Sequence, residues 1–209
     1  MEKIPALNDA EVRVLAALVE KESTTPEYYP LSLNALMLAC NQKTNSDPVV
    51  SYDEDKVSEA CDSLRAKNLA RSVAGSRVVK YEHSFLEVFN LGRRELALLC
   101  TLMLRGPQAV GELRDRSDRM RSFSDLEEVE ACLEGLMRLK QAPLVTRLAL
   151  HPGMKEPRYM HLLSGESEPP PGPAPERAEP LQQQIETLRR ELAELREEFA
   201  SFRRQLEPL

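Results

Sequence analysis

The stretch Leu7-Asn8-Asp9-Ala10-Glu11-Val12 recurs 84 positions later as Leu91-Gly92-Arg93-Arg94-Glu95-Leu96. The apolar residues that follow each stretch keep the same offset. A second pattern, with apolar residues at i, i+3, i+4 and i+7, occurs at 57–64 and again at 129–136, 72 positions later. A constant offset within each pattern indicates a duplicated unit, and the smaller second offset indicates a shorter connection in the second copy.

The first helix of each copy has a recognisable start. Asn8 is placed as an N-cap with Glu11 three residues later, which is the pattern of a capping box. Leu7 and Val12 flank this pair, as in a hydrophobic staple. In the second copy the same places are taken by Leu91, Gly92, Glu95 and Leu96. Both helices are therefore expected to begin directly after these caps.

The later helices follow in the same order in both copies. Second helices are expected at 31–40 and 110–116. Third helices are expected to begin after Ser51 and Ser124. Their capping boxes would use Glu54 and Glu127, and the helices would run to about Asn68 and Lys140.

Two β-rich runs close each copy, which predicts a hairpin. The runs are 69–73 and 77–81 around Gly75, and 144–150 and 158–163 around Pro152-Gly153. Three helices followed by a hairpin form the plan of a winged helix-turn-helix domain. We therefore predict a mainly α protein with small β-hairpin wings (α+β), built from two tandem winged helix-turn-helix domains at 1–84 and 85–163.

Three segments carry a resemblance to a known family: 36–49, 104–108 and 155–163. They are similar to the YceH-like family of uncharacterised bacterial proteins, over about residues 5–164. The resemblance implies two winged-helix domains and brings no established activity, substrate or cofactor. The chain departs from the family pattern at Ser46, where the family has arginine, so this loop carries less positive charge.

The bulk properties predict a cytoplasmic protein without a membrane segment. The 209 residues carry a formal net charge of −6 and contain no tryptophan. The N-terminus has no basic-then-apolar signal, and the longest apolar run is far too short to span a bilayer. A chain this acidic can bind nucleic acid only through a local basic patch.

Cysteines, histidines and known catalytic motifs give no sign of an active site. Glycine-rich phosphate loops and nucleophile or metalloprotease motifs are missing from the sequence, so we expect no enzyme, no cofactor and no metal. The three histidines lack the spacing of a metal site. Buried reduced thiols are expected at Cys40, Cys61, Cys100 and Cys132.

The expected third helices begin with acidic residues. In a helix-turn-helix, this turn meets the base edges of the major groove. Clustered carboxylates repel phosphates there, and they are better explained as stabilising the positive end of the helix dipole. The residues are Asp53, Glu54 and Asp55 in the first copy, and Asp125, Glu127 and Glu128 in the second.

Two basic or polar segments are candidate binding sites. A cluster at Arg114, Arg116, Arg119 and Arg121 could bind phosphate, since arginine can bond two oxygens at once. Acidic residues are interleaved with it, so a solvated face crossed by ion pairs is an equal alternative. The loop at 41–50 is either a structured connection or a recognition surface centred on Lys43 and Asn45.

The C-terminal part differs in composition. Residues 164–180 hold six prolines, which favours an extended linker. Beyond it a heptad pattern predicts a coiled-coil helix at 181–207. Its seam is Leu181, Ile185, Leu188, Leu192, Leu195, Phe199 and Phe202. The flanking Glu and Arg residues favour a parallel homodimer, with a trimer as the alternative. Sedimentation with and without 181–209 tests this prediction.

The sequence leaves two functions open. The first is a DNA-associated or regulatory recognition protein, with any DNA bound by the second domain. The alternative is an acidic winged-helix adaptor that binds proteins, similar to the kleisin-binding subunits of bacterial condensins. The acidic third helices favour the adaptor, and the arginine cluster favours DNA.

Overall fold

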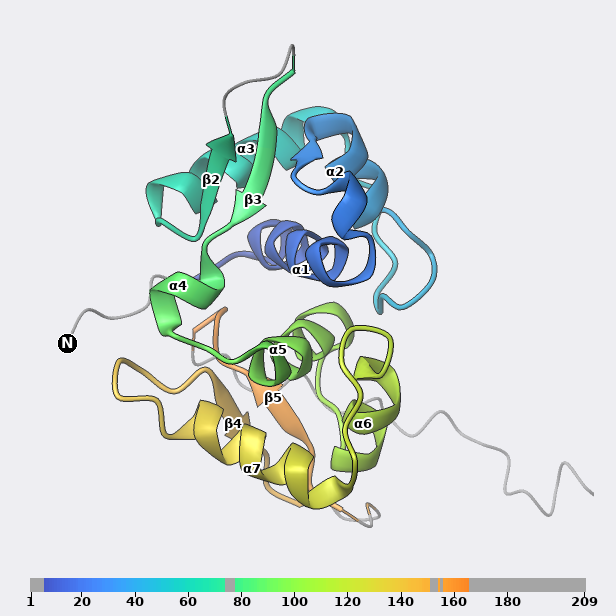
Figure 1. Ribbon diagram of the computed structural model, residues 1–209, viewed down its shortest axis with the longest axis vertical. Coiled ribbons are helices and arrows are strands. Elements are labelled where there is room, and N and C mark those ends of the chain that lie inside the picture. The colour runs from blue at the N-terminus through green and yellow to red at the C-terminus, as the bar shows by residue number, and fades with distance from the viewer. Residues whose placement is uncertain (1–5, 74–77, 151–153, 155, 166–209) are drawn as a thin grey trace, which may run out of the picture. The chain divides into compact units, whose positions relative to one another are not determined.

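Figure 1 shows the computed structural model, which describes residues 6–73, 78–150, 154 and 156–165. The described part is mainly helical and contains two small antiparallel sheets, as the predicted α+β class requires. All described residues belong to one compact unit. None of the helices described here is long and apolar enough to cross a membrane.

The first half contains three helices and a three-stranded sheet. In chain order its elements are α1 (Asp9–Thr24), a 3-10 helix η1 (Pro26–Tyr28), β1 (Leu31–Ser32), α2 (Leu33–Cys40), α3 (Glu54–Ala66), β2 (Ala70–Val73) and β3 (Lys80–His83). The strands lie in the order β1-β3-β2, and all pairs are antiparallel.

The expected second helix at 31–40 begins two residues late. Leu31 is buried and pairs with Tyr81 of β3, so it belongs to the sheet. Ser32 ends the strand and caps α2, because its hydroxyl accepts a hydrogen bond from the Ala35 amide at 3.3 Å. The prediction of a helix from residue 31 was wrong because the long-range pairing with β3 is not visible in local sequence.

The second half repeats this order after a connecting helix, α4 (Phe85–Phe89), which the sequence analysis missed. Its elements are α5 (Arg93–Arg105), α6 (Val110–Ser117), α7 (Leu126–Met137), β4 (Val145–Arg147) and β5 (Tyr159–His161). Strands β4 and β5 form an antiparallel pair. An isolated bridge between Gln108 and Tyr159 stands where β1 meets β3 in the first half.

The predicted caps are confirmed for α1. Asn8 accepts from the Glu11 amide at 2.9 Å, and the Glu11 carboxylate accepts from the Asn8 amide at 2.7 Å. In α5, Gly92 has no side chain to contribute, and the Glu95 carboxylate alone accepts from the Gly92 amide at 2.6 Å.

The predicted caps of the third helices are wrong. Asp53 caps α3 by accepting from the Lys56 amide at 2.9 Å, and Asp125 caps α7 by accepting from the Glu128 amide at 2.8 Å. Each aspartate stands directly before its helix, so its carboxylate reaches the amide three residues on, whereas Ser51 lies too far upstream. The two third helices also end earlier than expected, at Ala66 and Met137.

Helices α1 and α5 lie side by side in the middle of the described unit (Figure 1). The Cys100 thiol of α5 donates to the Ala16 carbonyl of α1 at 3.4 Å, and these positions are equivalent in the repeat. Every residue from Glu11 to Glu20 is buried, because α1 is covered by its own half on one side and by α5 on the other. One apolar core therefore spans both halves.

Candidate functional site

The exposed faces of α3 and α7 are acidic. On α3, Glu54, Asp55 and Glu59 are exposed and form no ion pair with a described residue. On α7, Glu127 and Glu130 are exposed in the same way. The other exposed charges of these faces include two neutral pairs, Arg65 with Asp62 and Arg138 with Glu134. Both helices thus present carboxylates where a nucleic-acid-reading helix would present donors.

The first turns of these helices use their acids as caps. Asp53 and Asp125 each accept a backbone N–H, so these two carboxylates satisfy amides at the helix starts. Glu128 accepts from the Ser124 amide at 3.0 Å and forms an ion pair with Arg94. Hydrogen bonds from the Ser124 backbone are the largest cause of the lowered pKa of Glu128.

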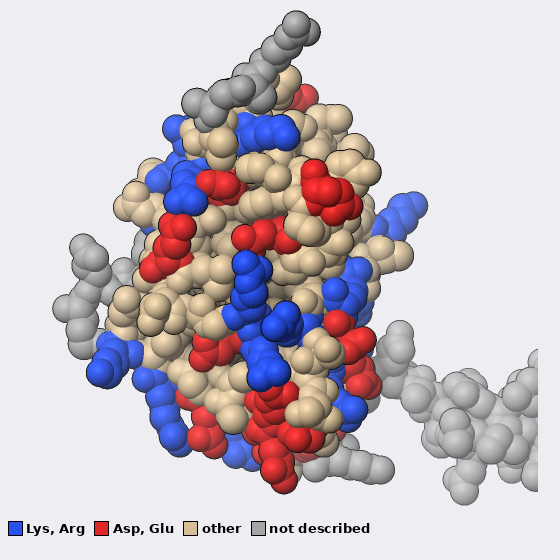
Figure 2. All heavy atoms as spheres, in the orientation of Figure 1, with Lys and Arg blue, Asp and Glu red and all other residues tan. Residues whose placement is uncertain are grey.

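The predicted arginine cluster is divided by the fold. Arg119 forms an ion pair with the buried Glu20 of α1. Arg116 lies 3.5 Å from Glu112, which also binds Arg158 at 3.2 Å. The remaining two, Arg114 and Arg121, are exposed, and neither forms an ion pair within the described ranges. Figure 2 shows a compact group of Lys and Arg over the position of α5, bounded by Asp and Glu, and no broad basic surface on this face.

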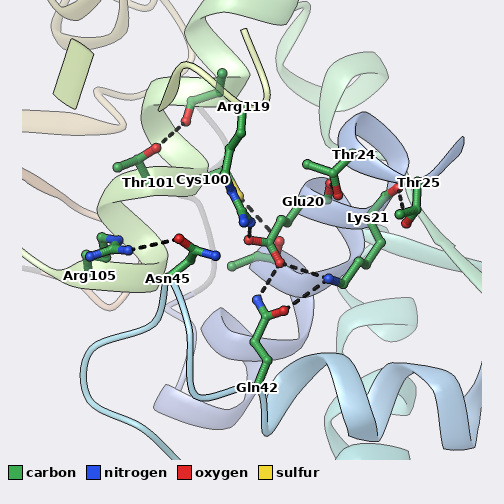
Figure 3. Close-up of polar contacts among 12 residues, drawn as sticks. Glu20, Lys21, Thr24, Thr25, Gln42, Asn45, Cys100, Thr101, Arg105 and Arg119 are labelled. Carbon is green, nitrogen blue, oxygen red and sulfur yellow. Dashed lines mark hydrogen bonds and ion pairs between the residues drawn. The ribbon is translucent and has the colours of Figure 1, made fainter. Parts of the chain in front are cut away.

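Glu20 is the centre of a polar cluster that joins the two halves (Figure 3). Its carboxylate has no exposed surface. It accepts from Arg119 of the second half and, at 2.5 Å, from the Gln42 amide of the 41–50 loop. Lys21 donates to the Gln42 side-chain oxygen at 3.0 Å. A buried carboxylate is therefore held by groups from two other segments of the chain.

The loop at 41–50 is bonded to its surroundings. Asn45 adopts a left-handed backbone with φ of 65° and accepts from Arg105 of α5 at 3.2 Å (Figure 3). The Asp47 amide donates to the Leu104 carbonyl at 2.8 Å, close to the end of α5. Ser46, where the family resemblance has arginine, is buried. Lys43 is exposed, so the loop presents this cation to solvent.

Arg13 is a buried cation that the sequence analysis did not single out. Only 5% of its surface is exposed, and its guanidinium donates to the Pro48 carbonyl. It forms no ion pair in the part of the chain that is described, and its Nη1 atom has no hydrogen-bond partner there. Charged residues inside the otherwise apolar run of α1 were the available signal for both Arg13 and Glu20.

The four cysteine thiols are free and at least partly buried. Burial raises the pKa of Cys40 and Cys61 to about 12. Cys100 is fully buried, and Cys132 is partly buried. The thiols of Cys40 and Cys61 are therefore protonated at neutral pH.

Of the described histidines, His83 is buried and His161 is partly buried. His83 shares a hydrogen bond of 3.0 Å with Glu22, and burial lowers the pKa of His161 to about 4. His151 lies outside the described residues. Within the described ranges, no three His, Cys, Asp or Glu residues are grouped as metal ligands. The coiled-coil residues Leu181, Ile185, Leu188, Leu192, Leu195, Phe199 and Phe202 also lie outside the described residues, so the dimer stays a prediction.

Comparisons with known proteins find relatives over most of the chain. A family described as "Protein of unknown function, DUF480" matches residues 7–154. A UPF0502 protein of Opitutus terrae is 54% identical over 190 residues, which are 87% of this chain and 83% of the relative. A UPF0502 protein of Citrifermentans bemidjiense is 58% identical over 163 residues, 78% of this chain and 75% of the relative. The corresponding protein of Solibacter usitatus is 55% identical over 163 residues, 78% of each chain.

Proposed function

Since this chain belongs to the DUF480 (UPF0502) family, the family of uncharacterised bacterial proteins that its sequence resembles, we propose a function from its own geometry. The protein is a non-enzymatic recognition scaffold of two tandem winged-helix units that binds a protein partner. The order of helices and antiparallel strands in each half supports the winged-helix assignment. The partner has a basic surface and contacts the exposed faces of α3 and α7.

The observation that carries this proposal is the charge of those two faces. Asp55, Glu59, Glu127 and Glu130 are exposed carboxylates without an ion-pair partner in the described part of the chain. They outnumber Lys56, which is exposed on α3 and lies over the Tyr52 ring. Such a surface repels a polyanion and attracts a basic protein surface. The ion pair between Arg119 and Glu20 also favours a protein partner over DNA, because it leaves one cation fewer in the arginine cluster to bind phosphate.

The test compares charge variants of the full chain. A pull-down from native cytosol, treated with nuclease, is made with the wild type, with Glu127→Gln/Glu130→Gln, and with Asp115→Asn/Asp118→Asn. The last pair removes the same charge from exposed residues on and next to α6. We expect a partner that survives nuclease and is lost only with the α7 variant. A partner that is retained equally by both variants would contradict the proposal.

A second candidate function is DNA binding by the second half. The exposed Arg114 and Arg121 favour it, because neither is neutralised by an ion pair in the described part of the chain. Fluorescence anisotropy with duplex DNA at low and physiological salt measures it. In this case Arg114→Gln/Arg121→Gln weakens binding and lowers the salt slope by about 2. Arg119 is left intact in this variant because it neutralises the buried Glu20.

A further inference from the structure

The duplication places a hollow at the same position in each half, between the first turn of the first helix and the exposed side of the third helix. In the first half this cavity has a volume of about 450 Å³ and is lined by Asn8, Asp9, Ala10, Lys56 and Glu59, among others. In the second half it measures about 680 Å³ and is lined by Arg93, Arg94, Arg121, Glu128, Ala131 and Cys132, among others. We call this second hollow the α5–α7 groove.

The two hollows differ in charge at equivalent positions. Arg93 of the α5–α7 groove takes the place of Asp9, and Arg94 takes the place of Ala10. On the third helix, Ala131 takes the place of Glu59. The scaffold therefore provides the cavity twice, and the side chains make only the second one rich in arginine.

Two of the groove arginines are available to a ligand. Arg93 and Arg121 are exposed, and no described carboxylate forms an ion pair with either. Arg94 is paired with Glu128 across the groove. Glu95 also lines the groove, and its carboxylate accepts a hydrogen bond from the Gly92 amide at 2.6 Å. The groove therefore holds two guanidinium groups without an ion pair beside a third that is paired. Arg93 also lies close enough to Glu22 to help lower the pKa of that carboxyl.

We propose that the α5–α7 groove binds the phosphate of a nucleotide unit, either a free nucleotide or part of a nucleic-acid strand. Arg93 and Arg121 reach the groove from separate segments, and each guanidinium can bond two phosphate oxygens. A phosphate group presents at least two free oxygens, so it can accept hydrogen bonds from both guanidinium groups at once. This inference is independent of the protein-partner proposal.

The remaining lining suits the organic part of such a ligand. The hollow is shallow and open to solvent, and at about 680 Å³ it is larger than a phosphate ion needs. Ala131 and Cys132 give it an apolar wall next to the arginines. A sugar or base can contact this wall while the phosphate stays at the charged end.

The experiment uses the full chain and two labelled probes, a fluorescent adenosine monophosphate and a fluorescent single-stranded oligonucleotide, followed by anisotropy. We expect at least one probe to bind, to be displaced by inorganic phosphate, and to lose at least about tenfold in affinity in Arg93→Gln/Arg121→Gln. Unlabelled adenosine, which lacks the phosphate, should not compete. Binding of the monophosphate identifies a free nucleotide as the source, and binding of the oligonucleotide alone identifies a strand.

The matched control is Arg138→Gln/Arg147→Gln, which removes the same charge from exposed positions of the same half outside the groove. It should bind like the wild type. Glu128→Gln frees Arg94 while keeping a hydrogen-bond acceptor near Ser124, and it should strengthen binding. Far-UV circular dichroism and thermal unfolding show whether each variant is folded. The inference is overturned if neither probe binds, if adenosine competes as well as phosphate, or if the groove variant and the control lose affinity equally.

Discussion

At the residue scale, Glu20 is a buried charge at the junction of the two halves, and its carboxylate has no exposed surface. A charge in this environment is tolerated only when cations and hydrogen-bond donors compensate for its lost hydration. Arg119, Lys21 and Gln42 supply that compensation from one side or the other of the junction between the halves. The cluster therefore stabilises the contact between the two halves.

We expect Arg119→Ala to lower the free energy of unfolding by about 2 kcal/mol or more, because it leaves the buried Glu20 without its closest cation. Urea denaturation measures the change. Arg114→Ala is the control, since Arg114 is exposed on α6, and its effect should stay within about 0.5 kcal/mol. In a Glu20→Gln background the loss caused by Arg119→Ala should shrink; an undiminished loss would show that the ion pair is not its cause.

The Glu22–His83 contact makes stability depend on acid pH. The His83 Nδ1 atom accepts from the Phe85 amide, so the Nε2 atom carries the proton and donates to Glu22 at 3.0 Å. This hydrogen bond is the largest cause of the lowered pKa of Glu22, outweighing burial, which raises it. The contact thus stabilises the fold above the ordinary glutamate pKa of 4.5, and the contribution is lost as pH falls below that value.

We therefore expect Glu22→Gln to flatten the fall in unfolding free energy between about pH 5 and pH 3. Glu27→Gln removes an exposed glutamate of the neighbouring 3-10 helix and should leave the wild-type slope in place. Denaturant titrations at a series of pH values measure both slopes. Equal slopes in the wild type and Glu22→Gln would mean that this carboxylate has no folded-state pKa shift.

At the element scale, the repeated helices are capped by different means. In α1 the Asn8 side chain and the Glu11 side chain each bond the backbone of the other, whereas in α5 only Glu95 contributes. A capping residue satisfies a backbone N–H that has no partner within the helix. The start of α1 therefore depends on its N-cap side chain more than the start of α5 does.

Replacement of this cap should be visible in stability. We expect Asn8→Ala to cost about 1 kcal/mol, because the Glu11 amide loses its acceptor. Gly92→Ala should cost less, since Gly92 contributes no side-chain bond and its φ of −75° is open to alanine. The added Cβ would lie 3.2 Å from Oε2 of Glu95, at the movable end of a side chain that can shift by a few tenths of an ångström. Thermal unfolding of both variants compares them directly. A larger loss for Gly92→Ala than for Asn8→Ala would contradict the assignment of the caps.

At the scale of the whole molecule, the central pair α1 and α5 gives both halves a common core. Backbone hydrogen bonds also cross between the halves, from the Leu7 amide to the Leu163 carbonyl at 2.7 Å and from the Asp47 amide to the Leu104 carbonyl at 2.8 Å. Separation of the halves would expose the sides of α1 and α5 that now face each other. That exposure would be unfavourable in water.

We accordingly expect residues 1–168 to unfold in one cooperative transition. Four of the five tyrosines, at positions 28, 29, 52 and 81, belong to the first half, and Tyr159 belongs to the second. Tyrosine fluorescence of variants that retain tyrosine in only one half therefore reports on each half separately. The two urea curves should coincide with each other and with far-UV circular dichroism. Two separated midpoints would show that the halves are independent.

The repeated units, the order of the main helices and the cap of α1 could be predicted from the sequence, because these features depend on residues within a few positions of each other. Residue 31 was assigned to a helix, and the third helices to the wrong caps, because pairing and close geometry decided between local alternatives. Which charges are paired became visible only once the chain was folded: Arg119 pairs with Glu20, whereas Arg93 and Arg121 line a surface hollow. The physical reason is that the energy of a charge depends on its neighbours in space and on its burial, and a linear pattern contains neither.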